Sequence, residues 1–387
     1  MTRWTTRRRA LALPMALIGL IATAAPAWGQ ARITWVVDQP YQVKELWSMN
    51  PDGSNRVSLV PGGFTASAPY SEIGEIAGPS VGTYPLDPFD PASPRVQWFL
   101  TNLKAQVGDE FLSHLFAFAP DGQGGVVWRR LSAQPYEAEP GVLVSLGRMT
   151  LPTSPDDSFA SLIVSRMYFD GPTFEESTTR ISSTELVVLS SPFERLEDSV
   201  TLADFEPVIP ERFNVSSLST YQHSWSPDGG TVAYIGSQSY PDGSSQRALR
   251  TYEVATGIDR VLVDRLVTGL SATYPRWAPN GSEIAFFNGN FVGNEQAVGT
   301  YAVHPVSGMI RAIATKGKSS NYVSQPVWSP DGSLMVGVQF YRGLNTNLQN
   351  RYSVVRFPAA GISRKNGIVS LTPTSDPYRY HAILNWR

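Results

Sequence analysis

Three short stretches decide the fold: Trp225-Ser-Pro-Asp-Gly229, Trp277-Ala-Pro-Asn-Gly281 and Trp328-Ser-Pro-Asp-Gly332. They stand 52 and 51 residues apart, and a degenerate copy, Ser154-Pro-Asp-Asp157, precedes them. In each copy Pro presets φ, Asp or Asn bonds to the nearby backbone, and Gly takes the positive φ that other residues disfavour. The motif therefore predicts a tight hairpin turn, and its regular spacing indicates a structural repeat.

Each turn is followed by a β-rich apolar run, at 231–235, 283–287 and 334–338. These runs are nearly continuous in hydrophobicity, which favours strands buried on both faces. A second turn follows 27 to 29 residues after the first, at Gly257, Gly308 and Gly361. One repeat is therefore four strands joined by two tight hairpins, and units of this kind and length are typical of β-propeller blades.

The two ends of the chain complement each other. Residues 383–386 read as a first strand that ends in the repeat Trp, and residues 33–37 read as a second strand. Together they predict one blade closed by pairing of the N- and C-terminal strands, which removes exposed sheet edges. The fold class is all-β. Six blades are predicted, at 33–60 with 380–386, 64–133, 141–203, 215–265, 271–316 and 321–372, and seven is the alternative because 61–93 and 134–150 have room for another.

The N-terminus has the order of a secretory signal. Four arginines precede an apolar run at 11–25, and small residues follow at Ala25, Ala27 and Gly29. We expect a signal peptide at 1–29, cleaved after about residue 27 to 29, and a single propeller domain at 30–387. The alternative, a membrane anchor, is disfavoured because the run is shorter than a spanning helix needs and is broken by Pro14. The predicted location is periplasmic or secreted, by the general or the twin-arginine route.

Composition limits the partners. Removing the four signal arginines from 31 basic residues leaves 27 against 33 acidic residues, a net charge of about −6. Because nucleic-acid binding depends on basic patches, we expect no nucleic-acid partner. There is no Cys, so disulfides and lipid-modified cysteine are excluded. We expect no stable membrane insertion after the signal is removed.

The Trp-Ser-Pro-Asp-Gly copies, the aromatic strand leading into Asn50-Pro-Asp-Gly-Ser54 and the terminal closure resemble the TolB-like β-propeller family of exported bacterial proteins. TolB carries an additional α/β domain before its propeller, whereas here the first β-run begins a few residues after the cleavage site. The resemblance therefore implies a TolB-like propeller without that domain, and it does not assign a role.

Blade topology divides the loops between two faces. First-to-second and third-to-fourth turns lie on one face, which the sequence predicts to be uniformly tight. Second-to-third loops and inter-blade links lie on the other face and hold insertions, at 65–90, 170–179, 203–222, 236–246, 288–299 and 341–350. Because binding groups concentrate on variable loops, we expect this long-loop face to be the working face, with Tyr240, Tyr341 and Arg342 as contacts.

Polar and aromatic residues precede or begin each first strand, and first strands line the channel of a propeller. The predicted channel-mouth binding residues are Tyr221, His223, Tyr274, Arg276, Tyr322, Gln325, Tyr380 and His381. Tyr and Arg are typical interface anchors. The alternative is that these residues only pack and turn the repeat.

Enzyme signatures are absent: there is no G-x-S-x-G elbow, H-E-x-x-H pair or Walker loop. Only four histidines exist, and His223 with His381 is the one pair predicted to meet near the channel. We therefore predict no catalytic residues, no metal and no cofactor. The predicted function is a non-enzymatic module that binds a protein or envelope component, with a glycan as the other ligand class. The alternative is a carbohydrate-active lyase or hydrolase, because similar propellers occur in oligogalacturonate lyases.

Overall fold

A computed structural model describes residues 31–38, 43–66, 68–107, 110–132, 137–139, 142–145, 156, 158–169, 180–196, 205–209, 223–289, 298–315, 322–341, 351–362, 367–373 and 380–386. The chain divides into one unit at Met1–Gln30 and a second at Ala31–Arg387. The predicted signal peptide lies outside the described residues.

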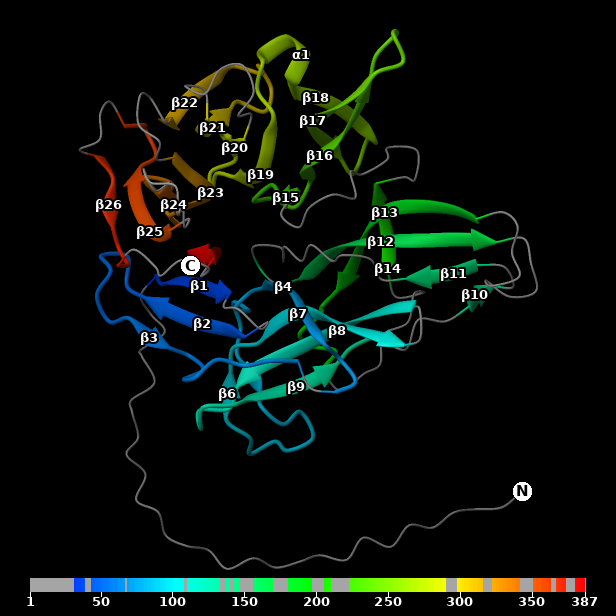
Figure 1. Cartoon of the computed structure of the whole chain (residues 1–387), viewed down its shortest axis with the longest axis vertical. Helices are drawn as coiled ribbons and strands as arrows, with labels where there is room; N and C mark the ends of the chain where they lie inside the picture. Colours follow the sequence, from blue (N-terminus) through cyan, green and yellow to red (C-terminus); the bar gives the residue numbers. More distant parts are fainter. Residues whose placement is uncertain are drawn as a thin grey trace, which may run out of the picture. The chain divides into compact units, whose positions relative to one another are not determined.

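The second unit is built from antiparallel sheets, shown in Figure 1. Sheet 1 has the order β27 (Tyr380–Trp386), β1 (Ile33–Asp38), β2 (Lys44–Met49), β3 (Val57–Ser58). Sheet 2 has the order β4 (Glu72–Ala77), β7 (Phe99–Val107), β8 (Glu110–Pro120), β9 (Val126–Arg130). Sheet 3 has five strands, in the order β10 (Glu137–Glu139), β11 (Val142–Ser145), β12 (Phe159–Phe169), β13 (Arg180–Ser190), β14 (Phe205–Ile209).

The C-terminal half is more regular. Sheet 4 has the order β15 (His223–Trp225), β16 (Thr231–Ser239), β17 (Ser245–Glu253), β18 (Ile258–Asp264). Sheet 5 has the order β19 (Ala272–Trp277), β20 (Ile284–Asn288), β21 (Gly299–Val303), β22 (Ile310–Thr315). Sheet 6 has the order β23 (Tyr322–Trp328), β24 (Leu334–Tyr341), β25 (Arg351–Pro358), β26 (Val369–Ser370). Within the described part of the chain the one α-helix is α1 (Arg265–Thr268). It is too short to cross a membrane.

The sheets are arranged as a propeller, which confirms the all-β prediction. Successive first strands β15, β19, β23 and β27 contact one another in order. A hydrophobic cluster fills each seam between neighbouring sheets: Ile235 of sheet 4 packs with Phe286 of sheet 5, for example, and Ala285 of sheet 5 packs with Met335 of sheet 6. The described residues hold five sheets of four strands, one of five and one of two. The predicted count of six blades, with seven as the alternative, stays a prediction.

The repeated turns explain the spacing of the motif. Gly229, Gly281 and Gly332 have φ of 70°, 72° and 72°, the left-handed region that favours glycine. A Cβ at Gly281 would lie 3.9 Å from Pro227 Cδ, and one at Gly332 would lie 3.5 Å from Pro279 Cγ. The turn glycine of one sheet therefore packs beside the turn proline of the sheet before it, so the motif also joins neighbouring repeats.

The predicted terminal closure is present. β1 pairs with β2 on one side and with β27 on the other, from Ile33 opposite Trp386 to Asp38 opposite Tyr380. Ile383 is 1% exposed and packs in the cluster shared by sheets 1 and 6. The last strand of the chain therefore supplies the first strand of sheet 1.

The prediction that first-to-second turns are uniformly tight is wrong for sheet 2. Residues 78–98 separate its first and second strands and carry a two-stranded ribbon, β5 (Tyr84–Pro85) with β6 (Arg95–Val96). This insertion is anchored because the Tyr84 ring stacks on Phe193 at 5.8 Å and Trp98 is fully buried. Much of the predicted 65–90 loop thus belongs to the first-to-second connection, on the opposite face from the one expected.

Candidate functional site

The first strands of sheets 5 and 6 share an irregularity at the predicted site. The pairing register shifts between Thr273 and Arg276 and again between Ser324 and Val327, so two residues of each first strand face one residue of the second. Tyr274 and Gln325 occupy the same place in these bulges, with φ of 54° and 52°. Non-glycine residues rarely adopt this conformation, and bulges re-aim side chains beside functional sites.

Two predicted channel-mouth residues bond the first strands to one another. Arg276 Nη1 donates to the backbone oxygen of His223 at 3.4 Å, which joins β19 to β15. The backbone N–H of Ile383 donates to Gln325 Oε1 at 3.2 Å, which joins β27 to β23. Gln325 is 4% exposed. The structure places both side chains at contacts that hold the propeller together.

His223 is packed in the seam between sheets 3 and 4. Its side chain is 1% exposed, and Nε2 lies 2.6 Å from Ser161 Oγ, which also accepts a hydrogen bond from Trp225 Nε1 at 3.0 Å. Burial, with a smaller contribution from the nearby Arg276 charge, lowers the pKa of His223 to about 3. The imidazole is therefore neutral at physiological pH and belongs to a buried hydrogen-bond network.

The other predicted histidine, His381, is 6% exposed in β27. Among the described residues no group of three or more His, Asp or Glu side chains is placed to hold a metal ion.

Tyr274 and Tyr322 belong to a different arrangement, the aromatic row. It consists of Tyr274, Phe287, Tyr322, Phe340 and Tyr352, with successive ring centroids 6.5, 5.5, 4.8 and 5.6 Å apart. Tyr322, Phe340 and Tyr352 face one another across β23, β24 and β25. Phe287 is 7% exposed, and the other four rings are half-buried.

The aromatic row lies at one end of its strands. Phe287 is near the end of β20 and Phe340 near the end of β24, whereas Tyr322 begins β23. This is the end where second strands pass into second-to-third loops, so the row lies on the long-loop face. Half-buried, closely spaced rings offer apolar area that a ligand can cover with little loss of side-chain entropy.

The predicted long-loop residues have separate locations. Tyr240 OH donates to Asp264 Oδ1 at 2.6 Å, and Asp264 also caps α1 through Leu266 N. Partial burial and this carboxylate raise the pKa of Tyr240 to about 12. Tyr341 ends β24 and Tyr380 begins β27, and their side chains lie outside the described part, as do Tyr221 and Arg342 entirely.

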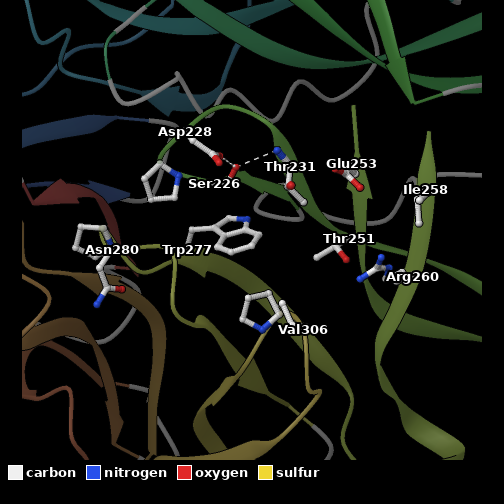
Figure 2. Close-up of a pocket in the computed structure, with 14 residues that line it drawn as sticks. Ser226, Asp228, Thr231, Thr251, Glu253, Ile258, Arg260, Trp277, Asn280 and Val306 are labelled. Carbon is white, nitrogen blue, oxygen red and sulfur yellow. Dashed lines mark hydrogen bonds between the residues drawn. The ribbon is translucent and has the colours of Figure 1, made fainter. Parts of the chain in front are cut away.

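A pocket of about 350 Å³ opens on the other face, at the seam between sheets 4 and 5 (Figure 2). Its walls are the motif turns of both sheets, the outer strands β17 and β18, and the β21–β22 turn. The Trp277 ring lies among them, with Glu253 and Arg260 on the sheet 4 side. Sequence reasoning missed this pocket because it searched the long loops. An alignment of the repeats could have found it, since Thr231 stands where the next repeat has Glu283.

Comparison with known proteins does not identify the chain. No family model matches it, and no curated protein matches its sequence. Solved structures with some similarity include a Mycobacterium tuberculosis puromycin-hydrolyzing peptidase (12% identity, 88% of this chain and 53% of that one, TM-score 0.46) and a puromycin hydrolase (16%, 89% and 53%, 0.43). Another is the GH74 xyloglucanase from Xanthomonas campestris (11%, 88% and 45%, 0.39).

The chain therefore spans about half the length of these proteins. At TM-scores of 0.46 or less, the similarities assign no substrate, partner or reaction. The resemblance to the TolB-like family also remains an expectation from the repeated motif.

Proposed function

We propose that this chain is an exported, non-enzymatic TolB-like propeller that binds a protein partner of the cell envelope through its long-loop face. The aromatic row carries this proposal. Five neighbouring rings form a large apolar surface at one end of their strands, and four of these rings are only partly buried. Aromatic anchors of this kind dominate the binding energy of protein interfaces.

The scaffold supports the same reading. The rings project from β20, β23, β24 and β25, whose pairing fixes their backbone positions before a partner arrives. Tyr274 adds a ring from a bulge whose backbone is held in an unfavourable conformation. Preorganised rings lose little conformational freedom on binding, so more of the contact energy appears as affinity.

The test is capture of the partner by the mature chain, starting at Gln30, from an envelope extract. A photo-crosslinking phenylalanine analogue replaces Phe340 in one variant and Phe89 in another. Phe89 is 69% exposed in the insertion of sheet 2, on the other face, so it is an aromatic control. We expect a defined protein adduct from position 340 that is absent from position 89 and is lost on adding Tyr322→Ala, in a variant that circular dichroism shows to remain folded.

Adducts of equal yield from both positions would overturn the proposal. So would an adduct that survives Tyr322→Ala, because the row would then not be the contact. Release of sugar fragments from envelope polysaccharide by the purified chain would instead establish the enzymatic alternative.

A further inference from the structure

The seam between sheets 5 and 6 shows how one repeat closes against the next on the tight-turn face. Arg311 Nε donates to Glu283 Oε1 at 2.6 Å, and its Nη2 donates to Glu283 Oε2 at 2.5 Å. Arg311 Nη1 also donates to the backbone oxygen of Ala359 in sheet 6 at 2.9 Å. One guanidinium thus has a carboxylate partner in its own sheet and a carbonyl partner across the seam.

The preceding seam has the same arginine without the carboxylate. Arg260 lies opposite Thr251 on the fourth strand of sheet 4, as Arg311 lies opposite Ala302 in sheet 5. The position of Glu283 is taken in sheet 4 by Thr231, whose side chain is shorter and uncharged. Within the described part of the chain Arg260 makes no ion pair. The pocket lies where the missing pair would be.

The acidic groups beside the pocket are engaged in their own turns. Glu253 Oε2 accepts a hydrogen bond from Thr256 Oγ1 at 2.9 Å. Asp228 Oδ1 accepts from Ser226 Oγ at 2.5 Å and from Gly230 N at 3.0 Å, and these bonds lower the pKa of Asp228. Figure 2 shows the Ser226 contact as a dashed line. The pocket therefore offers one exposed guanidinium, that of Arg260, with which no carboxylate of the described residues forms an ion pair.

Trp277 supplies an apolar surface in the same pocket. It is half-buried, whereas its counterparts Trp225 and Trp328 are each 7% exposed. The indole N–H of Trp328 donates to the backbone oxygen of Arg276 at 3.0 Å, and that of Trp225 donates to Ser161. Among the described residues the indole N–H of Trp277 has no acceptor. The seam between sheets 4 and 5 thus lacks the indole bond that crosses the next seam, and Arg260 lacks the carboxylate partner that Arg311 has within its own sheet.

We propose that this pocket binds a small monocarboxylate whose ring lies against the Trp277 indole while its carboxylate pairs with Arg260. Guanidinium and carboxylate form strong, often bidentate, charge-assisted hydrogen bonds. The volume of about 350 Å³ is at the lower end of small-molecule sites, which suits one ring. Arg260 is the one Lys or Arg in the lining, which also holds Glu253, so a second ligand carboxylate would have a like charge nearby and no cation to pair with, and a dicarboxylate should bind more weakly.

This site lies on the opposite face from the aromatic row, and it does not depend on the proposed protein partner. A sugar acid and an acylated aromatic amino acid share the chemistry of a ring and one carboxylate. Titration calorimetry on the mature chain with D-glucuronate and with N-acetyl-phenylalanine separates these sources. D-glucose and N-acetyl-phenylalanine amide are the neutral controls, and N-acetyl-4-carboxyphenylalanine, which keeps the ring and adds a carboxylate, tests the second charge.

Two variants remove the site in different ways. Arg260→Gln keeps most of the side-chain length without the charge, and Arg265→Gln, an exposed arginine in α1, is its control. The double variant Thr231→Glu with Glu253→His copies the Glu283 and His304 positions of sheet 5, so it supplies Arg260 with a carboxylate from the chain itself.

We expect at least one acid to bind in preference to its neutral control. Arg260→Gln should weaken it about ten- to a hundredfold, Arg265→Gln should leave it unchanged, and the double variant should abolish it with no fall in melting temperature. The proposal is overturned if neither acid binds at millimolar concentration, if acid and neutral control bind equally, or if Arg260→Gln has no effect.

Discussion

Acid should weaken the propeller through His223, and the size of the effect follows from its burial. The folded state holds the pKa near 3, whereas the unfolded chain has the ordinary value of 6.5. Between these two values the unfolded state binds a proton that the folded state does not bind. Stability is therefore fully present above pH 6.5 and falls as pH drops toward 3.

Each pH unit in this window costs about 1.4 kcal/mol. At pH 4.5, two units below the unfolded value, the contribution of His223 to the free energy of unfolding is lower by about 3 kcal/mol than at neutral pH. That is a substantial part of the roughly 5 to 15 kcal/mol that stabilises a typical domain. The physical cause is removal of the ring from water, together with the nearby guanidinium of Arg276.

The assay is urea unfolding at several pH values between 7.5 and 4.5 for the natural chain and for His223→Gln. The variant should be less stable at neutral pH because the contact with Ser161 changes, but its stability should depend less on pH. His304→Gln is the control, because His304 accepts hydrogen bonds from the N–H groups of Val306 and Ser307 in a surface turn. Equal pH slopes for the natural chain and His223→Gln would refute the reasoning.

Three further changes test the packing. Ile383→Ala should lower the free energy of unfolding in urea by about 2 to 5 kcal/mol, because it leaves a cavity where the terminal strands pack. Leu266→Ala, at a side chain that is 56% exposed, should lower it by less than about 0.5 kcal/mol. Equal losses for the two variants would contradict the terminal closure. Trp225→Ala should lower the melting temperature more than Trp277→Ala, since only Trp225 is buried and bonded across its seam, and the reverse order would be inconsistent. Gly332→Ala should cost about 1 to 2 kcal/mol and Gly332→Asn less, because φ is 72°; no difference between them would argue against left-handed strain.

The regular part of the fold was predictable because its signals are local. Pro, Asp and Gly act within one turn, and the five-residue motif at 225–229 is repeated at 277–281 and 328–332. Terminal closure was also predictable, because residues 33–37 and 383–386 each lack the strands that the other supplies. The insertion at 78–98 was not predictable. It has no repeated signal, and it is held by contacts with sheet 3, such as that of Tyr84 with Phe193, that are far apart in sequence.

Sequence position indicated where channel-mouth residues lie but not what they contact. Arg276 and Gln325 were predicted as binding residues, and the structure shows them bonding neighbouring first strands. Side chains normally point to alternate faces along a strand, and the sequence-based prediction assumed this alternation. A bulge breaks it and points the side chain elsewhere. A signal was present, because Pro275 and Pro326 each stand two residues before a motif Trp. Proline inside a strand commonly marks a bulge.

The repeats differ most where the fold does not require them to be alike. The motif turns must match, because each turn glycine packs beside the proline of the preceding sheet, at Gly281 with Pro227 and at Gly332 with Pro279. The far ends of the strands have no such constraint, and there the aromatic row appears. Arg260 and Arg311 occupy equivalent positions in sheets 4 and 5, so this position is alike in the two repeats, but its partner is not. Arg311 pairs with the carboxylate of Glu283, whereas Arg260 forms no ion pair among the described residues. In this chain the repeat whose arginine has no internal carboxylate is also the one that lines the pocket, so the proposed site is carried by a difference between the repeats and not by the motif that they share.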